Sequence, residues 1–321
     1  MPSLASSTKG PSILAGSQQN STGAVAERLE ARSRSALVFV PKGAKRTLVI
    51  LSLALAGCRG PINPTPTTDA VALRFLADSA TSPLLHDLAN SYRPGGLRLT
   101  WDIETAETYT VLDWLKAGEA PYALLDYLPG GFGSFGNAAG ASGDSLWTTP
   151  VGQDGIAIVV NPANPVANLS ASQLRMLFQG NVANWQEIGG LSQAVTVVAY
   201  PERSSQSAVM QAVVLGDRRM TQSALLALTS QAVIDKVSTS AGAVGYVSVG
   251  YVNGRVRAVP LDGVLPTPES MTAQRYPLST PILFAGLHEP GDDAYRAFFA
   301  WVQSPDGQAI VRQHYGGLST R

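Results

Sequence analysis

Continuous apolar runs alternate with amphipathic segments from about residue 70 onwards. "AVALRFLA", "LRLTWDI" and "YALLDYL" have the pattern of buried strands, and "SPLLHDLANSY" and "YTVLDWLKAG" between them have helical spacing. A strand–helix–strand–helix–strand order predicts a parallel sheet with both faces covered.

A second run of elements follows a glycine-rich stretch at residues 129–145. The predicted order is a strand at "GIAIVVNP", a helix at "SASQLRMLFQG", a strand at "AVTVVAY", a helix from about residue 204, a helix at "RMTQSALLALTSQAVIDKVS", strands at "AVGYVSVGYV", "VRAVPLD" and "PILFAG", and a last helix at "DDAYRAFFAWVQSPDGQAIVRQHY". Strands that pass between the two runs would form a hinge with a cleft between two lobes. We therefore expect an α/β fold with lobe I at residues 70–152 and 250–321 and lobe II at residues 153–249.

Composition narrows the class of protein. The chain has 321 residues, a net charge of zero, a pI of about 6.8 and one cysteine. This length can bury a large core and favours two lobes over one small domain. With a net charge of zero, the chain has no excess of positive charge to attract nucleic acid, so we expect no nucleic-acid partner. A single cysteine excludes an internal disulfide and a cysteine-rich zinc site.

The one cysteine, Cys58, follows a short apolar run, "TLVILSLALAGC", which basic residues precede. A membrane-spanning helix needs about 20 apolar residues, and this run is too short. Its last four residues resemble the bacterial lipobox, in which the cysteine is lipidated; a buried segment with an accidental cysteine is the alternative. We expect a leader or misassigned start at residues 1–41, a lipoprotein signal peptide at 42–58 and a Pro/Thr tether at 59–69.

The stretch Gly131–Gly136, "GFGSFG", matches the dinucleotide-binding pattern G-x-G-x-x-G. That pattern requires a helix to open within it, whereas residues 137–143 continue as glycine, alanine and serine without helical periodicity. We therefore expect a surface loop and no nucleotide cofactor.

The three histidines, His86, His288 and His314, show no spacing typical of a metal site or a catalytic triad. We expect each of them to be structural or solvated. No nucleophile–base pair is visible either, so we expect neither an enzyme nor a metal protein.

Hydroxyl and amide side chains are concentrated in "PERSSQSAVMQAVV", residues 201–214. Ser204, Ser205, Gln206 and Ser207 precede apolar residues at helical spacing. Such a segment has two interpretations. It is the N-cap of an ordinary helix, or it is a site for an anion at the helix N-terminus.

An ordered set of motifs in the second half of the chain indicates a family. Asn161-Pro162, Phe178 and Gly180, Asn184-Trp185 and Gly189-Gly190 occur in order within "GIAIVVNPANPVANLSASQLRMLFQGNVANWQEIGG". "AVGYVSVGYV", "YPLSTPILF" and "SPDGQAIV" follow. In these motifs the chain resembles the phosphate-binding component of high-affinity phosphate ABC transporters. The resemblance implies the two-lobed type II periplasmic-binding-protein fold.

The resemblance places the family's Ser-Gly-Thr-Arg anion motif on residues 204–207. Ser204 is kept, whereas Ser205, Gln206 and Ser207 stand where the family has glycine, threonine and arginine. Arg203 is the candidate replacement for the missing cation, and a solvated or salt-bridged arginine is the alternative. All five residues are expected to line the cleft.

The first lobe is expected to contribute Ser79, Thr81 and Asp126. Ser79 and Thr81 stand at the family's hydroxyl loop, and Asp126 matches its carboxylate that accepts a hydrogen bond from protonated phosphate. The alternatives are an N-cap for the two hydroxyls and a strand-end cap for the carboxylate. An added carboxylate at Asp78 and a lost arginine together predict weak binding of a dianion.

The expected function is that of a solute-binding protein of an ABC importer, with phosphate or a related oxyanion as ligand and permease subunits as partners. A lipid anchor at Cys58 would hold a monomer at the extracytoplasmic face of the membrane, in the periplasm or at the cell surface. The alternative is a sensor or interaction lipoprotein that has lost phosphate binding or that binds a different small solute.

Overall fold

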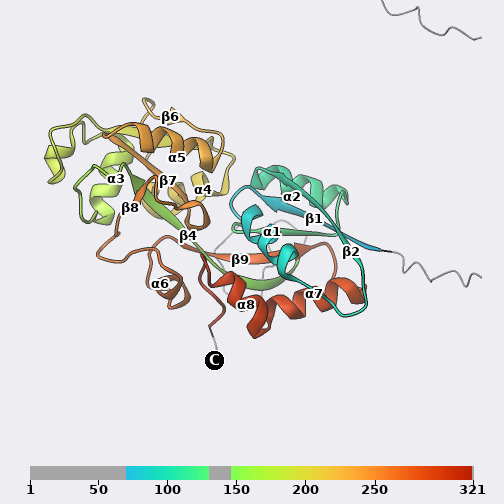
Figure 1. Cartoon of the computed structure of the whole chain (residues 1–321). Helices are drawn as coiled ribbons and strands as arrows, with labels where there is room; N and C mark the ends of the chain where they lie inside the picture. Colours follow the sequence, from blue (N-terminus) through green and yellow to red (C-terminus); the bar gives the residue numbers. More distant parts are fainter. Residues whose placement is uncertain (1–69, 130–145, 320–321) are drawn as a thin grey trace, which may run out of the picture. The chain divides into compact units, whose positions relative to one another are not determined.

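The structure is a computed structural model that describes residues 70–129 and 146–319 (Figure 1). Within these two ranges no helix is both long enough and apolar enough to cross a bilayer. The expectations for Cys58, for the leader, signal and tether segments, and for the loop at Gly131–Gly136 concern residues outside the described ranges.

The first group of strands combines parallel and antiparallel pairing. β1 (Val71–Asp78) pairs in parallel with β2 (Leu99–Ala106) and with β3 (Tyr122–Leu125). The three strands of the first run are therefore parallel, as expected. β9 (Ser279–Gly286), from the far end of the chain, adds an antiparallel neighbour to β3. The helices that contact these strands are α1 (Ser82–Ser91), α2 (Thr108–Ala117) and α7 (Asp293–Gln303), and α8 (Pro305–Val311) packs against α1 and α7.

The long strand β4 (Trp147–Val160) connects the first group of strands to a second one (Figure 1). It pairs antiparallel with β9 as far as Gly155 and with β7 (Ala243–Ser248) from Ile156 onwards. β4 is therefore a strand that passes from one group to the other, as the sequence suggested. The lobe boundaries drawn at residues 152 and 249 stay a prediction.

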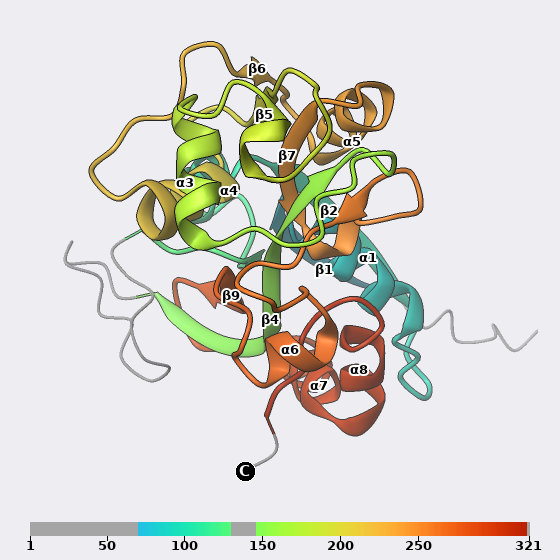
Figure 2. The same ribbon diagram turned by 90° about the vertical axis from the view of Figure 1, so that its left-hand side faces the viewer.

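The second group lies along the other end of β4 (Figure 2). β5 (Thr196–Ala199) pairs in parallel with β7 and with β6 (Leu225–Leu226), and β8 (Arg257–Ala258) pairs with β4. The helical elements of this part are α3 (Ala171–Gln179), a 3-10 turn (Trp185–Ile188), α4 (Ser205–Val209), a π-helical turn (Met210–Leu215), α5 (Ser230–Thr239) and a 3-10 turn (Val249–Tyr251).

Local sequence sets the ends of α3. The Ser170 side chain accepts a hydrogen bond from the backbone N–H of Gln173, and the Gln173 side chain accepts one from the backbone N–H of Ser170. This reciprocal pair satisfies two N–H groups that have no partner inside the helix. The helix ends at Gly180, whose φ of 78° is left-handed and favours glycine.

Three predicted elements differ from the structure. The single helix expected over residues 219–238 is instead β6 followed by α5, because Thr229 caps a new helix start. The last helix is divided at Ser304, which ends α7 and caps α8. A short helix, α6 (Pro268–Thr272), was not expected.

An aromatic cluster holds the strands of the first group in place. The Phe75 ring lies 5.6 Å from that of Phe284 and 5.5 Å from that of Phe298. Phe75 on β1 and Tyr122 on β3 are both buried, and their ring centres are 6.4 Å apart. This packing holds β1 and β3 side by side, and the polar residues described next lie at the C-terminal ends of these two strands.

Candidate functional site

Asp126 directly follows β3 and is completely buried. Neither of its carboxylate oxygens has a hydrogen-bond partner. Buried polar groups in native proteins are nearly always hydrogen-bonded, and an exception calls for an explanation. Asp126 is therefore the first residue of a candidate site.

Asp78, the last residue of β1, is also completely buried but has several partners. Its Oδ1 accepts hydrogen bonds from the backbone N–H of Thr81 at 2.9 Å and from the Thr81 hydroxyl at 2.7 Å. Its Oδ2 accepts from the backbone N–H of Asp126 at 3.2 Å and from the Thr108 hydroxyl at 3.4 Å. Asp78 thus ties the ends of β1 and β3 together.

Asp154 contributes a third buried carboxylate, from the middle of β4. Its Oδ1 accepts from the backbone N–H of Gly155 at 2.7 Å and from that of Val249 at 3.3 Å, whereas its Oδ2 has no partner. The hydroxyls of Ser248, at the end of β7, and of Tyr315 are also buried without a partner.

Burial and mutual repulsion make these carboxylates hard to ionise. Burial raises the pKa of Asp126 well above its usual range, and the nearby Asp78 carboxylate raises it further. Burial raises the pKa of Asp154 to about 7, although the Ser248 hydroxyl and the backbone N–H of Gly155 act in the opposite direction. Asp154 is therefore poised to exchange a proton near neutral pH.

Ser205 brings the second group of strands to this cluster, and Gln206 follows it in α4. Each is only 1% exposed, and the Ser205 hydroxyl and the Gln206 Nε2 have no partner. Ser205 lies near enough to Asp126 to lower its pKa, although no hydrogen bond of regular geometry reaches either oxygen. Of the residues predicted from the sequence, Ser205, Gln206 and Asp126 are those with buried polar atoms that remain unpaired.

Ser204 and Ser207 have internal partners instead. The Ser204 hydroxyl caps α4, since it accepts from the backbone N–H of Ser207 at 3.1 Å and donates to the carbonyl of Pro201 at 3.1 Å. The Ser207 hydroxyl lies 3.1 Å from the carbonyl of Tyr200 and 3.2 Å from the hydroxyl of Tyr246. The N-cap interpretation of this segment is thus observed, and a role for Ser204 and Ser207 in ligand binding stays a prediction.

Arg203 lies at the surface. Its side chain is 69% exposed, its Nη2 is 3.7 Å from Oδ2 of Asp113 on α2, and its guanidinium lies over the Tyr109 ring at 5.4 Å. No described residue forms an ion pair with Asp78, Asp126 or Asp154. Arg203 thus has the salt-bridged, exposed arrangement of the alternative interpretation, and a role for it in ligand binding stays a prediction.

Ser79 and Thr81 make contacts within the first group and beyond it. The Ser79 hydroxyl lies 3.2 Å from the carbonyl of Ala106. The backbone carbonyl of Ser79 accepts a 2.8 Å hydrogen bond from the Tyr251 hydroxyl. The Thr81 hydroxyl lies 2.8 Å from the carbonyl of Leu124 as well as contacting Asp78. Both side chains stabilise the loop after β1, and their role as ligand contacts stays a prediction.

The sequence analysis missed Asp154, Ser248 and Tyr315. Asp154 stands in "QDGIAIVV", where a charged residue within a buried strand was a usable signal. Ser248 and Tyr315 carry no such signal, because their proximity to Asp154 depends on how β4, β7 and the C-terminal segment meet. His86, His288 and His314 are exposed, and the described residues include no group of histidine, cysteine or acidic side chains that could hold a metal ion.

Comparison with known proteins gives consistent matches. The profile of the PBP superfamily domain matches residues 64–306. The phosphate-binding protein PstS of Bacillus subtilis (strain 168) is 30% identical over 125 residues, which make up 39% of this chain and 41% of that protein. PstS of Borreliella burgdorferi is 19% identical over 179 residues, 52% of this chain and 64% of that protein. The chain thus spans less than two thirds of the length of these two relatives.

Solved structures share the fold. A putative phosphate ABC transporter substrate-binding protein from Clostridium perfringens, with bound phosphate, has a TM-score of 0.69 and 22% identity over 77% of this chain and 100% of its own. An ABC-type phosphate transport receptor from Vibrio cholerae has a TM-score of 0.58 and 24% identity over the same shares. These relatives are named as binding and transport proteins and not as enzymes. The chain therefore belongs to the PBP superfamily and has the mixed α/β, type II periplasmic-binding fold of the phosphate-binding proteins.

Proposed function

We propose that the protein is the extracytoplasmic solute-binding component of an ABC importer and that its solute binds between the two groups of strands. One observation carries this proposal: both groups contribute buried polar atoms without partners, Asp126 from the first and Ser205 from the second. Small-molecule sites favour such boundaries, where a few polar groups converge in buried surroundings. A solute that bonds to both groups would hold them closed by a hinge motion.

Phosphate or a related oxyanion is the first ligand to test, because the named relatives bind phosphate. We expect weak phosphate binding. Ser207 stands where the family motif has an arginine, and Arg203 is paired with Asp113 at the surface. A hydrogen bond to a charged group contributes roughly 1.5–3 kcal/mol, so losing one weakens binding about ten- to a hundredfold.

Titration calorimetry of the purified protein with sodium phosphate tests this expectation. Wild type should bind weakly, Arg203→Ala should leave the affinity unchanged, and Ser207→Arg should increase it if the pocket accommodates the larger side chain. Tight binding by both wild type and Arg203→Ala would show that the site has no need of the missing cation.

Lipid attachment at Cys58 is a further part of the proposal, supported by the lipobox-like sequence before it. Cys58→Ala should abolish lipid labelling and move the protein from the membrane to the soluble fraction. Unchanged membrane association would reject the anchor. The sensor alternative predicts that no transporter permease or ATPase gene lies beside the gene for this protein.

A further inference from the structure

The buried cluster has an unusual balance of charge. It contains the carboxylates of Asp78, Asp126 and Asp154, all completely buried, and no lysine or arginine of the described chain is hydrogen-bonded or ion-paired with them. A buried carboxyl group without a partner keeps its proton to a higher pH, whereas one beside a positive charge ionises readily. The folded chain therefore supplies no positive charge to this cluster of carboxyl groups.

The atoms without partners show where the missing group belongs. Three of them are carboxylate oxygens, namely both oxygens of Asp126 and Oδ2 of Asp154. The Ser205 hydroxyl lies beside Asp126, and the Ser248 hydroxyl beside Asp154. Carboxylates only accept hydrogen bonds when ionised, and hydroxyls accept as readily as they donate. The complementary group is thus one that donates several hydrogen bonds.

Two other partners for these carboxylates fit the structure less well. A metal ion would need three or more ligating groups close together, and the described residues hold no such group. Arg203 is held at the surface by Asp113 and Tyr109. A dianionic oxyanion would find no cation in the cluster, so its charge would stay unbalanced.

We propose that the cluster binds the ammonium group of a small solute, with Asp126 as its main anionic partner and the Ser205 hydroxyl as a further acceptor. An ammonium group carries one positive charge and three N–H donors, which matches carboxylate and hydroxyl acceptors in number and sign. This inference rests on the proposed function and names the class of solute. An anionic group elsewhere on the same solute is compatible with it.

Proton exchange gives the binding a definite pH dependence. The ionisable groups that influence Asp126 and Asp154 are Asp78 and Tyr315, together with Tyr251 and, through Asp78, Glu107. None of them is a cation. Asp154, whose pKa burial raises to about 7, loses its proton as the pH rises from 6 to 8, which adds negative charge to the cluster and favours a cation. Ammonium binding should therefore tighten from pH 6 to pH 8, whereas oxyanion binding to the same cluster should weaken.

Matched solutes test the proposal by calorimetry and thermal shift at constant ionic strength. The probes are ethanolammonium chloride, ethylene glycol, which has the same size without the charge, and sodium phosphate. We expect ethanolammonium to bind with a dissociation constant of about 1 mM or lower, since very small ligands reach high efficiency per atom. Ethylene glycol should bind at least tenfold more weakly, and affinity for ethanolammonium should be higher at pH 8 than at pH 6.

Variants assign the effect to the cluster. Asp126→Asn keeps the shape of the side chain and should weaken ethanolammonium binding at least tenfold, whereas Asp87→Asn, on the exposed side of α1, should leave it unchanged. Phosphate binding without ethanolammonium binding would overturn the ammonium proposal and leave the solute-binding function standing. The absence of binding by all three probes would overturn the ammonium proposal and the expectation of phosphate binding alike.

Discussion

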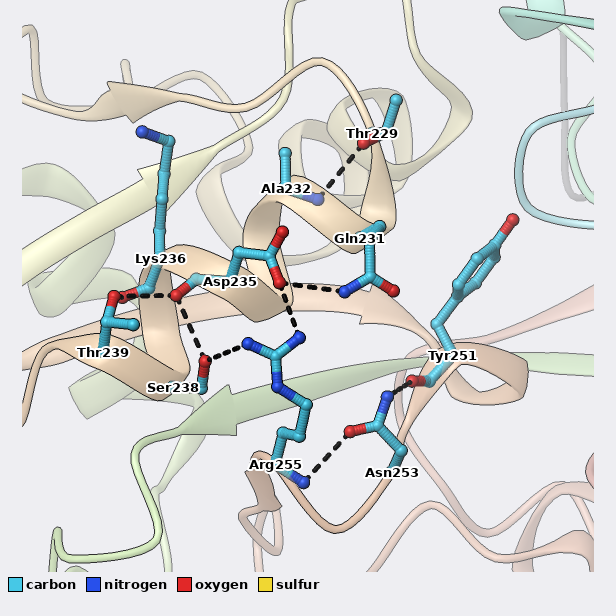
Figure 3. A network of polar contacts seen from close by, with 10 residues as sticks. All are labelled: Thr229, Gln231, Ala232, Asp235, Lys236, Ser238, Thr239, Tyr251, Asn253 and Arg255. Atoms are coloured by element: carbon cyan, nitrogen blue, oxygen red, sulfur yellow. Dashed lines mark hydrogen bonds and ion pairs between the residues drawn. The ribbon is translucent and has the colours of Figure 1, made fainter.

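Two carboxylates of this protein, Asp235 and Asp126, occupy opposite environments. Asp235, on the surface of α5, accepts hydrogen bonds from Arg255 at 2.6 Å and from Gln231 at 2.9 Å (Figure 3). These bonds lower its pKa. Asp126 is buried beside the Ser205 hydroxyl but without a cation, and burial raises its pKa. The exposed carboxylate of Asp235 thus has a cationic partner, whereas the buried carboxylate of Asp126, for which such a partner would matter more, has none.

This difference in hydrogen-bond partners distinguishes a polar group with a structural role from one that is available to a ligand. In the surface network Arg255 also donates to the Ser238 hydroxyl at 3.0 Å, and its backbone N–H donates to Asn253, so the turn before β8 is tied to α5 (Figure 3). Water could replace any of these bonds at little cost. Around Asp126 the protein excludes water and supplies no substitute, which is typical of a site that a ligand completes.

The largest expected effect of a buried carboxyl group is on the pH dependence of the free energy of unfolding. Between about pH 4 and pH 7, folded Asp154 holds a proton that the unfolded chain has released, because its pKa rises from 3.8 to about 7. Stability should therefore fall as pH increases through this window, by up to about 1.4 kcal/mol per pH unit from this group.

Urea denaturation of wild type and Asp154→Asn at several pH values measures this effect. The asparagine oxygen can still accept from Gly155 and Val249, so the difference between the two proteins isolates the titration. Parallel pH profiles for the two proteins would show that Asp154 ionises normally.

Loss of Asp78 is expected to have the next largest effect. Asp78→Ala removes the acceptor for the backbone N–H groups of Thr81 and Asp126, and both lie in the buried cluster. Each unsatisfied donor costs about 1–3 kcal/mol, and relief of repulsion against Asp126 offsets part of it. We expect a loss of about 2–3 kcal/mol in the free energy of unfolding, measured in urea. Asp78→Asn, which keeps one acceptor oxygen, should lose less; an equal loss would mean that the charge itself is required.

Asp126→Asn should change stability in the opposite direction. The carboxylate has no partner to lose, and its removal relieves burial of a charge and repulsion from Asp78. We expect an increase of about 1–2 kcal/mol in the unfolding free energy of the ligand-free protein at pH 8, together with the loss of solute binding. A loss of stability would identify Asp126 as a structural residue.

The sequence predicts the fold better than it predicts the site. Periodicity locates most strands and helices, and the charged residue that ends "YALLD", Asp126, is identified by its position after a buried strand. The run over residues 219–238 was misjudged because the pairing of β6 with β5 overrides its helical periodicity. Such pairing is a tertiary contact that no local pattern encodes.

The hydroxyl residues show the same limit at the site. Ser204 and Ser205 are neighbours of identical chemistry, yet Ser204 caps its own helix and Ser205 remains buried without a partner. Local sequence explains the first, because a serine before a helix is a common N-cap. The second depends on how α4 meets the end of β3, which sequence spacing does not reveal.

The smallest expected effect comes from breaking the surface network. Asp235→Asn removes the ion pair with Arg255, but both side chains are about half exposed and water can replace the lost bonds. Since its folded-state pKa is lowered, the stability that Asp235 contributes is present above pH 4 and disappears as pH falls through the folded-state value. Near neutral pH we therefore expect a urea midpoint close to that of wild type, with any difference reduced by salt. A loss as large as that of Asp78→Ala would mean that surface partners, and not burial, decide which carboxylates matter for folding.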